Sequence, residues 1–155
     1  MRATRRALIA IGVTSVLTAC GMDHMGGSNV TPLADRIQDA RAELTRHNNA
    51  IESAQTIGVV PAEVERYETS MSNIMSGMSS TMRGMMSHCG GSGMGTMHGM
   101  MDDVTTELSV HRTVMLGETD LGDTRVACAE HVTRVNGMLD GMHRALGSMG
   151  CMTGY

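Results

Sequence analysis

Methionine is the residue type in this sequence best suited to chemistry, because it recurs at helical spacing beside histidine. The 155-residue chain has 18 methionines and 7 histidines, but no phenylalanine or tryptophan. Thioether sulfur is a soft ligand that favours Cu(I), and by the same chemistry Ag(I), over hard cations. It also binds metal without first losing a proton. The residues that this pattern predicts as soft-metal ligands are Met78, Met82, Met85, Met94, Met97, His98, Met100 and Met101.

Packing is the competing explanation for these methionines. With so few aromatic side chains, methionine must fill much of any core, and for a single methionine on a predicted helix packing is the favoured interpretation. Loop and tether positions are different, because packing gives no obvious reason for methionine there. Met22, Met25, Met94 and Met152 are expected at such positions.

A second candidate site combines histidine with a thiol. Counted from the nearest predicted interhelical connection, His111, Cys128 and His131 lie at a similar depth, as does Tyr67. His47 and Met71 are expected about one turn deeper. Cysteine and histidine ligands would suit copper or zinc. Each histidine alone is more often a hydrogen-bonded core residue, and no haem-attachment motif is present.

Four helical segments must position these groups, and no alternating strand pattern is evident. Short connections favour antiparallel neighbours, so we expect an all-α, up-down-up-down four-helix bundle, with a three-helix arrangement and a loose first helix as the alternative. The predicted helices span residues 32–57, 61–88, 97–116 and 123–149, with a flexible loop at 89–96 and a break at 117–122.

The expected topology also sorts the cysteines. Cys89 and Cys151 would lie at the same end of the bundle, whereas Cys128 would lie near the opposite end. A disulfide requires Cα atoms within about 7 Å. We therefore predict a Cys89–Cys151 disulfide, with Cys128 left as a buried thiol.

The first twenty residues carry a more specific pattern. Three arginines precede an apolar run that is too short to span a membrane, and the run ends in Leu17-Thr18-Ala19-Cys20. This segment resembles the lipobox of bacterial lipoproteins. The resemblance implies a signal peptide over residues 1–19, lipidation of Cys20 and a membrane anchor, with Gly21 favouring the outer membrane facing the periplasm. Residues 20–31 are then a flexible tether and residues 32–155 the bundle.

Composition narrows the functional classes. The formal net charge of −4 argues against nucleic acid as a partner. The chain contains no catalytic triad motif, phosphate loop or zinc-protease motif, so we do not expect an enzyme. Its methionine-histidine clusters are similar to those of periplasmic copper-handling proteins. We expect an envelope lipoprotein that sequesters Cu(I) or Ag(I), or transfers it to a copper-handling partner. The alternative is a structural or interaction lipoprotein without metal, and a minor third is a methionine-based oxidant sink.

Overall fold

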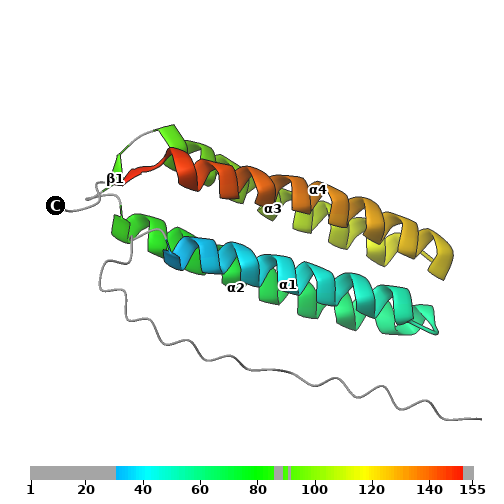
Figure 1. Cartoon of the computed structure of the whole chain (residues 1–155). Helices are drawn as coiled ribbons and strands as arrows, with labels where there is room; N and C mark the ends of the chain where they lie inside the picture. The colour runs from blue at the N-terminus through cyan, green and yellow to red at the C-terminus, as the bar shows by residue number, and fades with distance from the viewer. Residues whose placement is uncertain (1–30, 86–88, 91, 152–155) are drawn as a thin grey trace, which may run out of the picture.

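The computed structural model describes residues 31–85, 89–90 and 92–151, and this part of the chain is almost entirely helical (Figure 1). The prediction of an all-α fold with four helices is confirmed. The helices are α1 (Thr31–Ser53), α2 (Val60–Met85), α3 (Ser92–Gly117) and α4 (Leu121–Ser148), and a 3-10 turn, η1 (Ile57–Val59), leads into α2.

Each long helix packs against two others. α1 contacts α2 and α4, and α3 also contacts α2 and α4, so the four helices enclose one core (Figure 1). A two-residue ladder that we did not predict joins β1 (Cys89–Gly90) to β2 (Gly150–Cys151) in antiparallel register. Because β1 follows α2 and β2 follows α4, the ladder brings the ends of these two helices together.

Two helix boundaries differ from the prediction by four residues or more. α1 ends at Ser53 rather than at residue 57, where the Ser53 hydroxyl donates to the backbone carbonyls of Asn49 and Ala50 and so competes with continued helix. α3 begins at Ser92, inside the predicted loop. A Cβ atom on Gly93 would lie 2.6 Å from the carbonyl oxygen of Ala145, so this glycine permits close helix packing instead of marking a loop.

The core consists of two apolar clusters. The larger runs along most of the bundle and contains many of the methionines, whereas the smaller lies near the α1–α2 and α3–α4 connections and consists of Ile51, Val60, Val64, Met115 and Cys128. Most of the predicted methionine ligands belong to the larger cluster. Buried in it are Met78, Met82, Met85, Met97 and Met101, and packed against it are Met94 and Met100.

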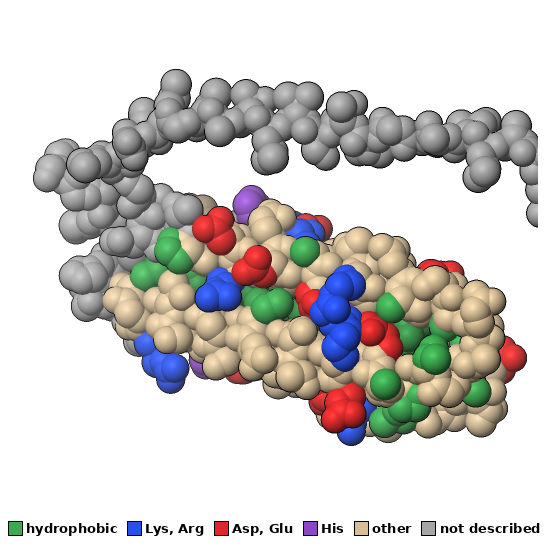
Figure 2. Space-filling model, turned by 90° about the horizontal axis from the view of Figure 1, so that it is seen from below, with side chains coloured by type: hydrophobic (Ala, Val, Ile, Leu, Met, Phe, Trp, Pro, Cys, Tyr) green, Lys and Arg blue, Asp and Glu red, His purple; other side chains and the backbone are tan. Residues whose placement is uncertain are grey.

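The outer surface is polar and of mixed charge. Figure 2 shows acidic and basic side chains interspersed along one face of the bundle. Some of them pair across helices, as Arg41 of α1 does with Asp140 of α4 at 2.6 Å. Among the described helices, none is long and apolar enough to cross a membrane.

Candidate metal centre

Four aromatic rings, one from each helix, form a layer between the two apolar clusters. His47 lies on α1, Tyr67 on α2, His111 on α3 and His131 on α4, and none of the four is more than 2% exposed. His47 stacks on Tyr67 with ring centroids 4.0 Å apart, and His111 stacks on His131 at 3.7 Å. Contacts between the two stacks are edge-to-face. We call this set the ring layer.

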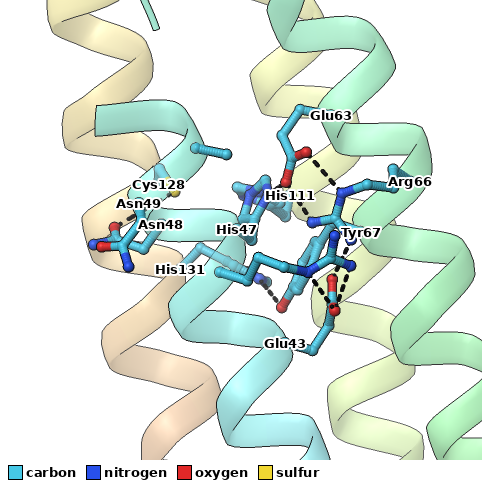
Figure 3. Close-up of polar contacts among 12 residues, drawn as sticks. Glu43, His47, Asn48, Asn49, Glu63, Arg66, Tyr67, His111, Cys128 and His131 are labelled. Atoms are coloured by element: carbon cyan, nitrogen blue, oxygen red, sulfur yellow. Dashed lines mark hydrogen bonds and ion pairs between the residues drawn. The ribbon is translucent and has the colours of Figure 1, made fainter. Parts of the chain in front are cut away.

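Hydrogen bonds cross the ring layer between opposite helices. The Nε2 atoms of His47 and His111 lie 3.0 Å apart, and the Tyr67 hydroxyl lies 3.0 Å from His131 Nε2 (Figure 3). The Nδ1–H of His47 donates to the Glu63 carboxylate at 3.0 Å, which leaves its Nε2 as an acceptor. His111 must then donate Nε2–H to it. The lone pair on His47 Nε2 thus points toward the centre of the bundle.

Carboxylates accept hydrogen bonds from the Nδ1 atoms of two of these histidines. Glu63 accepts from His47, and Glu107 accepts from His131 Nδ1 at 2.9 Å. Each carboxylate also pairs with an arginine, Glu63 with Arg66 and Glu107 with Arg134. A carboxylate behind an imidazole fixes the tautomer and orientation of the ring, which is the usual second shell of a metal-binding histidine.

The Cys128 thiol lies beside the ring layer, one helical turn from His131. It is fully buried and free of any disulfide, as predicted. Donor atoms of His47, His111 and Cys128 all lie within 4.8 Å of one another. The thiol also contacts Asn48 Oδ1 at 3.8 Å. These three residues are the metal-ligand group that the described part of the chain brings together.

Burial determines the protonation states in the ring layer. Together with the nearby His131, it lowers the pKa of His47 to about 3 and that of His111 to about 2. It also raises the pKa of the Cys128 thiol to about 12 and raises the pKa of Tyr67. At neutral pH the imidazoles are therefore uncharged, and the thiol and phenol keep their protons. Neutral imidazole is the form that binds metal.

The structure regroups the residues that we predicted for the core site. His111 and Cys128 come together as expected, but His47 joins them in place of His131, whose Nε2 accepts the Tyr67 hydroxyl. A short repeat in the sequence pairs His47 with His111. Glu43-Leu44 precedes His47 with the same spacing as Glu107-Leu108 precedes His111.

The predicted methionine ligands are mostly dispersed through the core. One subset differs, because Met82 of α2 and Met94 and His98 of α3 line the same cavity of about 450 Å³. Its other lining residues are Ser79, Arg83 and Gly95. Met94 therefore lies on a helix and not in a loop. We call this space the methionine pocket, since two thioethers and an imidazole share it.

Several predictions fall outside the described residues or remain predictions. The lipobox and Cys20 lie outside, as do Met22, Met25 and Met152. Cys89 and Cys151 are directly opposite Cα partners in the β1–β2 ladder, and their disulfide remains a prediction.

Comparisons with known proteins add no assignment. No family model matches the chain, and searches of curated proteins and solved structures return no match. The function must therefore be argued from the ring layer, its thiol and the methionine pocket.

Proposed function

We propose that this protein is a lipid-anchored envelope protein that binds a soft metal ion, Cu(I) or Ag(I), for sequestration or transfer. One observation carries the proposal. His47, His111 and Cys128, from three different helices, bring two nitrogens and a sulfur within 4.8 Å of one another in the buried core.

Distances within this group suit a single ion. Two imidazole nitrogens bound at 2.0–2.1 Å to one ion lie about 3.3 Å apart at a tetrahedral angle and about 3.6 Å apart at a trigonal angle. The Nε2 atoms of His47 and His111 lie 3.0 Å apart, so they would separate by roughly 0.3–0.6 Å. A sulfur on the same ion lies about 3.5 Å from each nitrogen. With all three atoms within 4.8 Å, the thiol would have to approach by no more than roughly 1.3 Å.

The protons displaced by metal binding can also be accounted for. The Cys128 thiol loses its proton to solvent, and the proton between the two Nε2 atoms moves to His111 Nδ1, so that both Nε2 lone pairs reach the ion. The Nδ1–H of His47 stays hydrogen-bonded to Glu63, which already holds that ring in the required tautomer.

The alternative is a structural function without metal. In that case the same contacts only specify how the helices pack.

Ligand chemistry favours a soft ion. Thiolate selects Cu(I) over hard cations, and imidazole suits copper as well as zinc. The methionine pocket supports the same class of metal independently, because Met82, Met94 and His98 offer two thioethers and an imidazole to one cavity. Being on the surface side of the core, it would suit an exchangeable ion passed to or from a copper-handling partner.

The architecture and location are parts of the proposal. The lipobox supports an anchor at Cys20. Short connections and the pairing of β1 with β2 support an up-down-up-down course of the helices. In that arrangement the ring layer lies toward the connections of α1 to α2 and of α3 to α4, and the methionine pocket toward the opposite end.

Metal titration of the full-length chain in detergent, with Cu(I) under anaerobic conditions and a chromophoric competitor, tests this function. We expect the wild type to bind at least one equivalent. Loss of a direct ligand in Cys128→Ala should weaken that equivalent by more than the roughly 10–100-fold typical of outer partners. Tyr67→Phe is the matched control and should retain it, because the hydroxyl contacts His131 and no proposed ligand. Less than one equivalent bound, or equal binding by Cys128→Ala, would refute the proposal.

A further inference from the structure

The ring layer has an internal two-fold relation. Its two diagonal hydrogen bonds, His47 to His111 and Tyr67 to His131, each join residues 64 positions apart. The stacked pair His47–Tyr67 corresponds by this offset to the stacked pair His111–His131. The two remaining edge-to-face pairs also correspond, with centroid distances of 6.5 and 6.1 Å. Equivalent contacts made in both directions are the mark of a two-fold axis.

The same offset relates the cores of the two helical hairpins. Hairpin α1–α2 and hairpin α3–α4 bury side chains at matching positions along their whole length. Buried pairs separated by 64 residues include Leu33/Met97, Ile37/Met101, Ala40/Val104, Leu44/Leu108, Ile51/Met115, Met71/Val135, Met75/Leu139, Met78/Met142 and Met85/Met149. The chain is thus built as two equivalent hairpins around the His47–His111 contact.

The metal-ligand group breaks this relation at one position. The residue equivalent to Cys128 is Val64, which is 1% exposed and belongs to the same buried cluster. Because Cys128 Sγ lies within 4.8 Å of both histidine donor atoms, the two-fold relation places the side chain of residue 64 at a similar distance on the opposite side. Valine offers no ligand there, and its neighbours Ile51, Val60 and Met115 in that cluster offer no nitrogen or oxygen to hold a water molecule on that side.

We infer that Val64 restricts this centre to three protein ligands and thereby makes it selective for Cu(I) over Zn(II). Structural zinc sites are almost always four-coordinate and tetrahedral, whereas Cu(I) accepts two or three soft ligands. The charge count agrees. Cu(I) with one thiolate and two neutral imidazoles is a neutral unit. Zn(II) would add one positive charge in the buried core, and the nearby carboxylates of Glu63 and Glu107 already pair with Arg66 and Arg134. The inference rests on the proposed function and adds the identity of the metal at that site.

Restoring the two-fold relation tests the inference. In the full-length chain, Val64→Cys would supply a second thiolate and complete a tetrahedral set of two histidines and two cysteines. A direct ligand should contribute more than the roughly 10–100-fold typical of second-shell groups, so we expect Zn(II) affinity to rise at least about 100-fold. Co(II) should then give the absorption of a tetrahedral two-thiolate site. Val60→Cys is the matched control, since it adds a thiol to the same cluster one turn away and should give neither change.

A measurement on a chain that keeps Val64 protects the test against a Val64→Cys variant that fails to fold. X-ray absorption of the Cu(I)-loaded chain should give one sulfur and two nitrogens at the ring-layer centre, read in a Met82→Leu/Met94→Leu background that removes the pocket thioethers. Four ligands, or a wild-type Zn(II) affinity equal to that of Val64→Cys, would overturn the inference and leave the proposed function standing. Failure of Cu(I) to bind the wild type would overturn both.

Discussion

Near the α1–α2 and α3–α4 connections, donor atoms from three different helices lie close together. Along the rest of the bundle, the thioethers lie mostly one by one in the core. In the ring layer, His47 Nε2 has His111 Nε2 at 3.0 Å and the Cys128 sulfur close by. Met78 and Met97 are just as deeply buried, but they belong to an apolar cluster. Both regions contain metal-binding side chains, but in the ring layer three donor atoms from different helices lie within 4.8 Å of one another.

Hydrogen bonding accounts for this difference. Imidazole is directional, and Glu63 and Glu107 fix the His47 and His131 rings from outside. A thioether has three rotatable bonds and only a weak acceptor, so it adapts to whatever space its neighbours leave. For His47, the position of the donor nitrogen therefore depends on the carboxylate behind the ring. The methionine pocket lacks such support and would hold an ion more loosely.

Acid should act most strongly on the ring layer. His47 and His111 have folded-state pKa values near 3 and 2, well below the 6.5 of an unfolded histidine, so below pH 6.5 the unfolded chain binds protons that the fold excludes. Stability is thus complete above pH 6.5 and falls with acid, by about 1.4 kcal/mol per pH unit for each histidine. Urea unfolding of the metal-free chain should show a loss of about 3 kcal/mol between pH 6.5 and 5, because the unfolded histidines are only half protonated at pH 6.5.

The pH window separates this effect from that of the carboxylates. Burial raises the pKa of Glu43 and of Glu63, and these groups stabilise the fold as they take up protons, which offsets part of the loss at lower pH. Equal stability at pH 7 and pH 5 would show that the ring layer is not the acid-sensitive region.

Sequence periodicity predicted the helices and the buried methionine stripe, but not the composition of the ligand group. The error lay in one boundary. With the first helix extended to residue 57, His47 was counted a turn too deep, whereas α1 ends at Ser53 and α3 at Gly117. Both His47 and His111 thus lie six residues before a helix end. The methionine pocket could not be predicted from the sequence for a different reason. Its residues Met94 and Gly95 lie in the first turn of α3, and Gly93 allows this turn to pack closely against α4.

At the end of the bundle that carries the β1–β2 ladder, a disulfide should contribute to the stability of the fold. The ring layer contains no such bond among the described residues. Cys89 and Cys151 are opposite each other in the ladder, and we expect peptide mapping without reductant to find them bridged. Cys89→Ser should then lower the free energy of unfolding by about 2–4 kcal/mol without changing Cu(I) affinity at the ring-layer centre. A mapped bridge from Cys128 to either cysteine would contradict both the prediction and the proposed helix order.

Leucine substitutions distinguish packing methionines from ligand methionines with the smallest change in stability. Met78 is fully buried in the larger cluster, and Met78→Leu keeps its volume, so we expect a cost below about 1.5 kcal/mol and unchanged Ag(I) binding. Met82→Leu/Met94→Leu should cost similarly little, yet remove the Ag(I) equivalent that depends on the methionine pocket. Titration calorimetry with Ag(I) in a Cys128→Ala background, where the buried centre is disabled, makes that equivalent visible. If both substitutions leave silver binding intact, the pocket thioethers serve packing as Met78 does, and the soft-metal chemistry of this protein belongs to the ring layer alone.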